Sequence, residues 1–296
     1  MDVSIIYVNY NTISLLLNSI DSVLKETKDV EFEIIVVDNN SNDHSEATII
    51  DKYKGQIKYI KLSENIGFGR ANNVGAKIAK GRHLFFLNPD TRLLNNVVKY
   101  LSNYLDVNFQ TGICGGNLYD KEFQPNHSYM PVLPSILYEI NLLFNNFLYR
   151  LIYGSLYDFN STEQPKKVGY ITGADMMIRA SVFNEVGGFD SDFFMYYEEA
   201  ELTFRIKGLG YEIMNIPKAR IIHYESKSFH TSLSKQERLL VSRKIYYYKV
   251  YKTCFLRKLS DVIFFVACLM AIVVFKITRN RDKYKVWRFN LKNYKF

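Results

Sequence analysis

Short apolar segments alternate with segments of helical periodicity along the N-terminal third of the chain. The runs VSIIYV and FEIIVVD are almost continuously apolar, which is typical of strands covered on both faces, and IKYIKL and RHLFFLN predict a third and a fourth strand. Between them, TISLLLNSIDSVLKET and GRANNVGAKIAKG repeat their apolar residues at helical spacing. Strands that alternate with helices predict an α/β fold with a mostly parallel sheet flanked by helices.

The middle of the chain is less regular. Residues 121–168 are rich in Tyr, Leu, Phe and Asn without clear periodicity. We expect this stretch to form a lid, a substrate-facing insertion or a pair of short helices. The segment GYITGADMMIRASVFNEVGGFD then predicts a return to strand, helix and turn.

Charge divides the chain near residue 235. From Lys235 onward there are 16 Lys and Arg against 3 Asp and Glu, whereas residues 1–234 carry 22 against 27. This C-terminal extension, residues 235–296, also contains 14 uninterrupted apolar residues, Val262–Phe275. As a helix this run would measure about 21 Å, short of the roughly 30 Å hydrocarbon core of a bilayer. We therefore expect a globular body followed by a helical extension that lies on a membrane surface or dips part-way into it. A buried helix packed against the body is the main alternative, and a membrane-spanning helix is less favoured.

The cysteines and the N-terminus favour a reducing, cytoplasmic location. Cys114, Cys254 and Cys268 share no short spacing, which argues against a disulfide framework and a cysteine-built zinc site. The chain begins directly with the strand segment DVSIIYVNY, without the pattern of a cleavable signal.

Polar residues follow each of the first four predicted strands. These groups are Asn9-Tyr10-Asn11, Asp38-Asn39-Asn40, Asn65 with Gly67 and Gly69, and Asn88-Pro89-Asp90. Pro89 can continue neither a strand ladder nor a helix, so Asp90 is expected in a turn at a strand end. Any one group is compatible with ordinary turn chemistry. Their repetition at one edge of a parallel sheet predicts a ligand-binding edge.

A nucleotide would fit this edge. It could stack its base on Tyr10, present its base or ribose to Asp38 and direct its phosphates to Arg70. The segment GFGRAN lacks the third glycine of a dinucleotide fingerprint and follows the third strand instead of the first. This excludes a Rossmann dehydrogenase.

Carboxylates gather in the segment MYYEEAELTFR. Glu198, Glu199 and Glu201 stand at the start of a predicted helix, where acids also stabilise the helix dipole. The alternative is that one of them is a general base. His223 follows a short apolar strand and is either structural or a ligand of a divalent metal.

Taken together, these motifs resemble those of family 2 inverting glycosyltransferases, in the rhamnosyltransferase-like subgroup with the GT-A fold. The resemblance runs from about residue 3 to residue 228. It rests on VSIIYVNYN, EIIVVDNNS, NIGFGRANN, FLNPDT, ITGADMMIRASVFNEVGGFD, FFMYYEEAEL and IIHYESKS. It implies a nucleotide-binding half at about 1–115 and an acceptor-side half at about 116–234.

The resemblance also implies roles for individual residues. Asp90 matches the aspartate that holds Mg²⁺ or Mn²⁺ against the donor diphosphate, with His223 as a second ligand. Asn88 replaces the first aspartate of that motif and supplies no charge. Glu199 takes the position of the catalytic base. The supporting residues are Glu198, Glu201 and Asp175, and the nucleotide-sugar contacts are Tyr10, Asn11, Asp38, Asn39, Asn65, Arg70 and Asn88.

The implied activity is inverting, metal-dependent sugar transfer from a nucleotide-diphosphate sugar to a lipid-linked saccharide in surface polysaccharide synthesis. The leading donor is dTDP-L-rhamnose, with galactofuranose and other hexose donors as alternatives. We expect the enzyme at the inner face of the cell membrane, attached through its extension, and without a nucleic-acid partner. A non-catalytic nucleotide-sugar-binding or scaffold subunit is the principal alternative. A glycoside hydrolase with paired carboxylates is disfavoured, because hydrolysis needs neither a nucleotide nor a metal.

Overall fold

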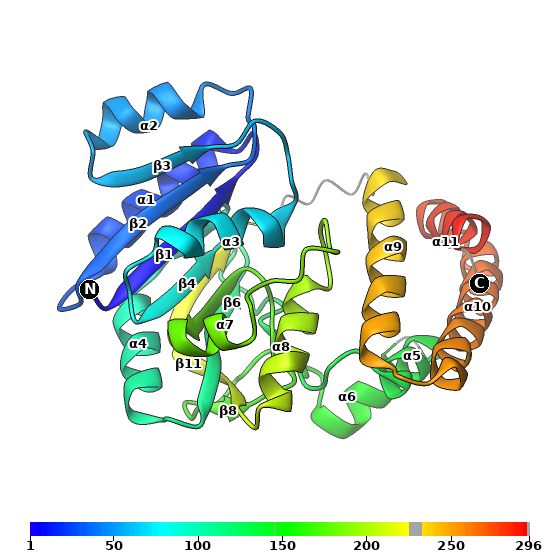
Figure 1. Ribbon diagram of the computed structural model, residues 1–296. Helices are drawn as coiled ribbons and strands as arrows, with labels where there is room; N and C mark the ends of the chain where they lie inside the picture. Colours follow the sequence, from blue (N-terminus) through cyan, green and yellow to red (C-terminus); the bar gives the residue numbers. More distant parts are fainter. Residues whose placement is uncertain (145, 225–232, 295–296) are drawn as a thin grey trace.

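The fold is built on one nine-stranded sheet, seen in a computed structural model that describes residues 1–144, 146–224 and 233–294 (Figure 1). The strand order is β3 (Ile57–Lys61), β2 (Phe32–Asp38), β1 (Val3–Asn9), β4 (His83–Leu87), β10 (Asp175–Arg179), β6 (Thr111–Tyr119), β11 (Glu212–His223) and β5 (Thr91–Leu93), and β8 (Lys166–Lys167) pairs with β11.

The mostly parallel sheet predicted from the sequence is confirmed. β3, β2, β1 and β4 are all parallel neighbours, and β6 is parallel to β11. β10 lies antiparallel between β4 and β6, and β5 is antiparallel to β11. The carboxyl ends of β1, β2, β3 and β4 therefore meet at one edge of the sheet.

Helices cover both faces of the sheet. Ile5 and Tyr7 of β1 pack in one layer with α1 (Ile13–Glu26), α2 (Ser45–Tyr53) and α4 (Val97–Val107). Ile6 and Val8 pack in the other layer with α3 (Phe68–Ile78), α7 (Ala180–Glu185) and α8 (Glu198–Gly208). Neighbouring residues of a strand point to opposite faces, so a continuously apolar strand supplies both layers of the core.

The irregular middle segment contains a pair of short helices, one of the three outcomes expected for it. β7 (Tyr129–Met130) pairs with β9 (Tyr170–Ile171) in a separate two-stranded sheet. Between these strands the chain forms α5 (Ile136–Leu143) and α6 (Phe147–Tyr153). We call this pair the α5–α6 insertion.

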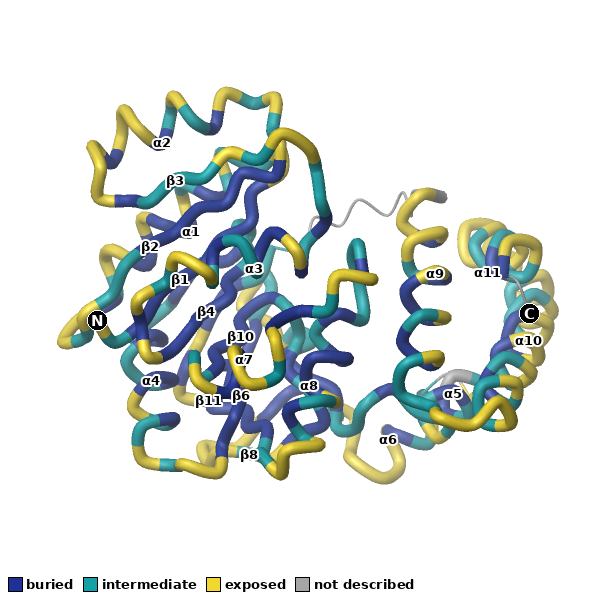
Figure 2. The backbone as a smooth tube through the Cα atoms, in the orientation of Figure 1, coloured by how far each residue is buried: buried dark blue, intermediate teal, exposed yellow. Residues whose placement is uncertain are grey.

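The C-terminal extension is helical, as predicted, and consists of α9 (Leu233–Val250), α10 (Cys254–Ile277) and α11 (Arg281–Asn293). Tyr246 and Tyr247 of α9 are buried in a cluster with Phe193 and Ala200 of the body. Figure 2 shows buried residues along α9, whereas α10 and α11 are largely exposed or intermediate on their outer side. α9 thus packs against the body, whereas the membrane attachment expected for the extension stays a prediction.

By length and composition, α10 is the one helix of the described residues that could cross a membrane. Its most apolar stretch is only 22% buried within the protein. Its inner side packs with α11 and α9 through Phe264, Cys268 and Tyr294.

Candidate active site

A cavity of about 530 Å³ opens at the edge where the parallel strands end. Its wall comes from the loops after β1, β2, β3 and β4, from the ends of β9 and β11, and from the start of α8. Eight of the thirteen residues that the sequence predicted for the site line it: Tyr10, Asn39, Asn65, Asn88, Asp90, Glu198, Glu199 and His223. The sequence segments that carry the expected chemistry thus converge on one space.

The turn at Pro89 places Asp90 next to His223. β5 pairs with β11 so that His223 lies opposite Thr91, and the Tyr224 amide donates to the Asp90 carbonyl oxygen over 2.9 Å. In this arrangement His223 Nε2 lies 3.3 Å from Asp90 Oδ1. The exposed fractions of the two side chains are only 11% for His223 and 20% for Asp90. One carboxylate and one imidazole therefore converge at the cavity wall.

This pair fits a divalent cation that takes its other ligands from a phosphate group. Carboxylate oxygen and imidazole nitrogen are both ligands of such ions, and Mg²⁺ commonly binds through one or two carboxylates together with substrate phosphates. No cluster of three or more His, Cys, Asp or Glu ligands occurs in the described part of the chain. The two residues alone would hold an ion weakly, so we expect its binding to depend on the nucleotide.

A strained turn presents the two glutamates at the start of α8. Tyr196 and Tyr197 both have left-handed backbone conformations, with φ of 74° and 68°. Such conformations cost about 1–3 kcal/mol each in a non-glycine residue and are common at functional sites. The turn is supported from α9, where Ser242 Oγ donates to the Met195 carbonyl oxygen over 2.8 Å and the Tyr246 ring packs on Tyr197. α9 therefore helps to position both glutamates.

The two neighbouring carboxyl groups have different environments. Glu198 is only 4% exposed, and burial together with the charge of Glu199 holds the pKa of Glu198 well above its ordinary value. Burial also raises the pKa of Glu199, although a backbone hydrogen bond and, to a smaller degree, His127 oppose this effect. Both carboxyl groups are therefore held above the ordinary pKa of a glutamate, and burial is the main cause in each case.

Gly67 fixes the loop after β3 against this turn. It has φ of +89°, and an added Cβ would overlap the Phe194 carbonyl oxygen. The Phe68 amide donates to that same oxygen over 2.9 Å. Only glycine allows this close approach, which explains the first glycine of GFGRAN.

Asn39 and Asn65 are held together beside this loop. Asn39 Nδ2 donates to Asn65 Oδ1 over 2.8 Å, and Asn39 Oδ1 accepts the Ile66 amide over 2.9 Å. Tyr10 is 49% exposed at the mouth of the cavity, which leaves its ring open to a ligand.

Three other predicted site residues do not line the cavity: Asp38 and Asp175 are buried, and Asn11 is exposed. Asp38 is buried and accepts hydrogen bonds from Asn9 Nδ2 over 2.8 Å and from the Ser41 amide over 2.7 Å. Asn11 accepts from the Asn42 amide over 2.7 Å. Asp175 is fully buried and accepts the Gly116 amide over 2.6 Å, and burial raises the pKa of Asp175 well above its usual range.

Glu201 and Arg70 also lie outside the cavity lining. Glu201 forms a two-pronged ion pair with Arg205, with both N–O distances at 2.7 Å. Arg70 Nε donates to the Ser191 carbonyl oxygen over 2.6 Å and borders a separate pocket with Lys244 and Lys249. The cavity geometry gives no support to the predicted phosphate contact of Arg70.

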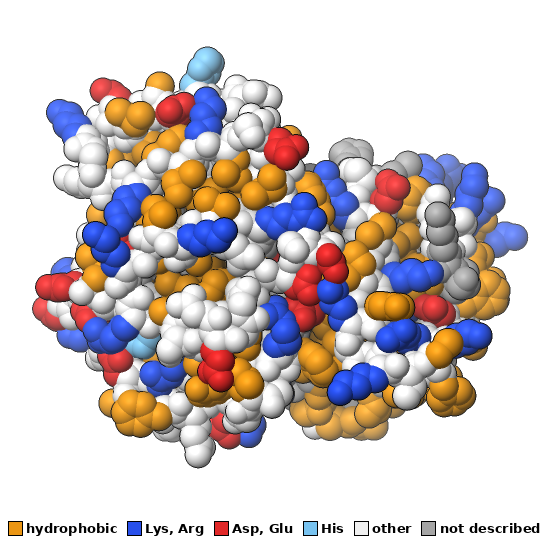
Figure 3. Space-filling view, viewed as in Figure 1, with side chains coloured by type: hydrophobic (Ala, Val, Ile, Leu, Met, Phe, Trp, Pro, Cys, Tyr) orange, Lys and Arg blue, Asp and Glu red, His pale blue; other side chains and the backbone are white. Residues whose placement is uncertain are grey.

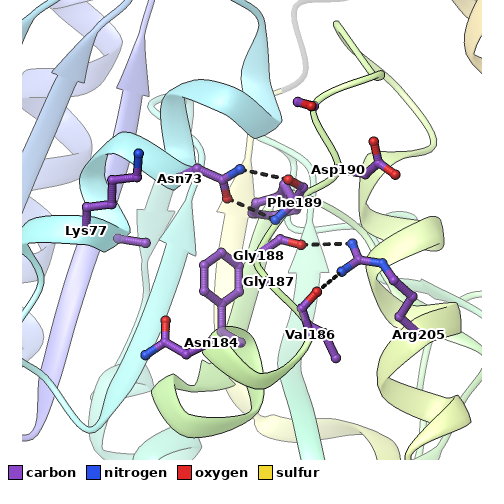
Figure 4. A pocket seen from close by; sticks show the side chains of 12 residues that line it. Asn73, Lys77, Asn184, Val186, Gly187, Gly188, Phe189, Asp190 and Arg205 are labelled. Atoms are coloured by element: carbon purple, nitrogen blue, oxygen red, sulfur yellow. Dashed lines mark hydrogen bonds between the residues drawn. The ribbon is translucent and has the colours of Figure 1, made fainter.

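A different surface pocket, of about 690 Å³, lies between α3, α7 and α8 (Figure 4). Its polar side chains bond to the backbone around them: Asn73 Nδ2 donates to the Phe189 carbonyl oxygen, and Arg205 donates to the carbonyl oxygens of Val186 and Gly188. These bonds hold the loop after α7, so we read this pocket as structural.

Sequence reasoning missed several residues of the cavity, above all Arg238 and His127. Arg238 lies on α9, with its guanidinium carbon 4.8 Å from the Phe194 ring centre, and it is the one Lys or Arg among the described residues that line the cavity. His127 Nδ1 lies 3.0 Å from Asp158 Oδ2. His127 belongs to the irregular segment and Arg238 to the extension, two parts of the chain without a motif that pointed to a site.

Comparison with known protein families gives a match over more than half of the chain. The family described as Glycosyl transferase family 2 matches residues 4–187. The chain is 36% identical over 105 residues to the poly(ribitol-phosphate) β-N-acetylglucosaminyltransferase TarP of Staphylococcus aureus. The matched residues cover 34% of this chain and 32% of TarP. The match thus spans about a third of that relative's length.

Two relatives named as rhamnosyltransferases match over more of their length. The Escherichia coli rhamnosyltransferase WbbL is 27% identical over 246 residues, covering 73% of this chain and 85% of WbbL. The Mycobacterium tuberculosis N-acetylglucosaminyl-diphospho-decaprenol L-rhamnosyltransferase is 23% identical over 209 residues, covering 66% of this chain and 67% of that protein.

A solved structure has the same fold. GalNAc-T7, crystallised with UDP, GalNAc and Mn²⁺, matches with a TM-score of 0.60 and 17% identity, over 89% of this chain and 54% of that one.

Proposed function

This chain belongs to glycosyl transferase family 2, and we propose that it transfers an L-rhamnosyl group from dTDP-L-rhamnose to a lipid-linked saccharide, with inversion. The observation that carries the proposal is the cavity itself, where Asp90 and His223 face the same space as Glu198 and Glu199. Relatives named as rhamnosyltransferases support the choice of sugar.

The cavity offers a contact for each part of a nucleotide-sugar donor. Tyr10 has an open ring on which a base can stack, and the paired amides of Asn39 and Asn65 line the same cavity. For the diphosphate we propose Arg238 in place of Arg70, because a guanidinium binds phosphate oxygens with paired hydrogen bonds. Asn88 lies next to Asp90 in the wall and can donate to the ribose or a phosphate.

We assign Asp90 and His223 as the residues that hold Mg²⁺ or Mn²⁺. When bound, such an ion neutralises charge on the departing diphosphate. The distance of 3.3 Å between the two side chains supports this assignment.

Glu199 is the proposed base. It accepts the proton of an acceptor hydroxyl while that oxygen forms its bond to the anomeric carbon, and the bond from this carbon to the diphosphate oxygen breaks with its electron pair. A single displacement inverts the anomeric configuration. Glu198 also lines the cavity and can form a hydrogen bond with the sugar or the acceptor.

The acceptor is proposed to be lipid-linked, and the enzyme to work at the cytoplasmic face of a membrane through the extension that starts near residue 235. The name of the mycobacterial relative includes a decaprenol carrier, which supports an acceptor of this class. The concentration of positive charge in this extension supports attachment to an anionic surface.

Comparing Glu199→Gln with Glu198→Gln tests the function. We expect Glu199→Gln to lower kcat by about 10²–10⁴-fold with unchanged donor affinity, since an amide keeps the shape but accepts no proton. The assay is a panel of nucleotide sugars screened for thermal stabilisation with Mn²⁺, followed by turnover with the stabilising donor. A loss confined to Glu198→Gln would refute the assignment of the base. Binding without turnover in the unmodified protein would favour the non-catalytic alternative.

A further inference from the structure

The α5–α6 insertion and α10 together expose a broad apolar surface, which we call the apolar face. On α10, Val262, Val266, Leu269, Val273 and Ile277 recur every three or four residues on the exposed side. A stripe at this spacing normally faces a protein core. Here the opposite side of α10 is the buried one, so the apolar stripe has no partner in the described part of the chain.

The insertion extends this surface. Leu151 and Ile152 of α6 are 72% and 66% exposed, and Phe147 is 60% exposed. α5 packs against α10, so the insertion and the extension are neighbours in space although they lie far apart in the sequence. In Figure 3 hydrophobic side chains gather where Figure 1 places α6 and along the outer side of α10. Exposed apolar surface of this extent is typical of an interaction site.

Basic residues frame the α10 stripe at both ends. Arg257 and Lys258 precede it, Lys276 lies beside its last residue, and Arg279 follows it. Apolar side chains framed by cations match an anionic lipid surface, in which the apolar groups enter the acyl boundary and the cations meet the headgroups. A protein partner would need acidic groups arranged around an apolar patch. An anionic membrane supplies both the apolar acyl chains and the negatively charged headgroups.

α10 is held to the body in a way that favours lying on a membrane over crossing it. Arg243 of α9 donates to the Ser260 carbonyl oxygen of α10 over 3.0 Å and to Glu139 Oε1 of α5 over 3.0 Å. A spanning α10 would have to break these buried bonds and expose the charges to hydrocarbon.

We propose that the apolar face lies in the interface of an anionic membrane, with the α5–α6 insertion contributing as well as α10. This rests on the proposed function, and it gives the insertion a role there. α9 connects the two sites: Arg238 lines the cavity, and Arg243, about 7.5 Å further along the helix, contacts α5 and α10. One helix thus joins the cavity to the two elements that carry the apolar face, and a lipid-linked acceptor would present its sugar from that membrane.

The test uses the full chain and matched pairs of substitutions in a vesicle flotation assay. The vesicles are phosphatidylcholine alone or phosphatidylcholine with phosphatidylglycerol. The pair Leu151→Ser and Ile152→Ser probes the insertion, and Leu269→Ser and Val273→Ser probes α10. The control pair, Val107→Ser and Phe109→Ser, removes apolar side chains that are equally exposed, 75% and 77%, but lie outside the apolar face.

We expect the unmodified protein to bind the anionic vesicles and to be released by alkaline carbonate. Each pair on the apolar face should lower the partition coefficient at least about tenfold, since each removes two large apolar groups from the lipid contact. The control pair should change it less than twofold. Far-UV circular dichroism and Mn²⁺-dependent nucleotide diphosphate binding should be unchanged in all variants.

Three results would overturn the proposal. Unchanged vesicle binding of the Leu151 and Ile152 pair would exclude the insertion from the interface. Resistance of the unmodified protein to carbonate would indicate a spanning α10. A dimer that becomes monomeric in these variants, without vesicle binding, would assign the apolar face to a second copy of the chain. If the unmodified protein binds vesicles but does not bind a nucleotide diphosphate, the proposed function is refuted while the membrane result stands.

Discussion

Replacing Arg243 with alanine should destabilise the docking of the extension by about 3–5 kcal/mol, because it leaves a buried carboxylate without its partner. The exposed fraction of the Arg243 side chain is 4% and that of Glu139 is zero. Arg243 also donates to Ser260 Oγ over 2.8 Å and to the Tyr294 hydroxyl. Its guanidinium carbon lies 4.2 Å from the Phe264 ring centre, so four helices lose contacts at once.

The single tryptophan of the chain makes this measurable. Trp287 lies on α11 and packs against Phe264, so its fluorescence reports on the docking of α10 and α11. In urea unfolding, tryptophan fluorescence gives the free energy of undocking of α10 and α11. Far-UV circular dichroism gives the free energy of unfolding of the whole chain. In Arg243→Ala the fluorescence transition should move to lower urea concentration than the circular dichroism transition.

A double variant tests the reasoning more sharply than the single one. Arg243→Met with Glu139→Leu removes both charges. The double variant should regain most of the free energy of unfolding that Arg243→Ala loses, because replacing a buried ion pair with apolar residues is often neutral or stabilising. Arg257→Ala is the matched control: this arginine lies 3.9 Å from the Tyr248 ring centre but is more exposed, and its loss should cost about 1 kcal/mol or less. A loss under about 1 kcal/mol in Arg243→Ala, or a double variant as unstable as the single, would refute this account.

Three further predictions concern the cavity. Burial holds the pKa of Glu198 above 4.5, its ordinary value, in the folded state. The stability that the protonated carboxyl contributes is therefore complete below pH 4.5 and is lost as the pH rises through the raised pKa. Glu198→Gln should raise the melting temperature above neutral pH, and this gain should disappear toward pH 4.5. Arg238→Ala should weaken nucleotide diphosphate binding at least about tenfold by calorimetry, while Arg257→Ala leaves it unchanged. Asp90→Ala should abolish the Mn²⁺ dependence of nucleotide binding, and His223→Ala should reduce it less; unaltered metal dependence in Asp90→Ala would exclude the assignment.

The parts of the site that the sequence predicted well are those fixed by local rules. A proline after an apolar strand forces a turn, so the position of Asp90 at the strand end follows from Asn88-Pro89-Asp90 alone. Polar residues after successive parallel strands must share an edge, which brought Tyr10, Asn39 and Asn65 to the cavity. In these cases the backbone geometry restricts where these residues can lie relative to the sheet.

The parts that the sequence did not predict depend on packing between distant segments. Arg70 follows a glycine-rich loop, as a phosphate-binding residue would, but its side chain bonds to Ser191 and points to another pocket. Arg238 has no motif around it and reaches the cavity only because α9 packs against α8. The direction of a long side chain on a helix is decided by its tertiary neighbours, which local spacing does not contain.

The role of α9 changes how the C-terminal extension should be understood. An extension that served only for attachment would leave the catalytic cavity intact when removed. Here α9 supports the strained turn at Tyr196 and Tyr197 through Ser242 and Tyr246, and such a turn persists only where its surroundings hold it. Arg243 joins the same helix to α5 and α10, so α9 contacts both the elements of the apolar face and the turn before Glu198 and Glu199. In the proposed function, membrane contact and alignment of the base would both depend on α9, and a chain that ends before α9 should lose both together.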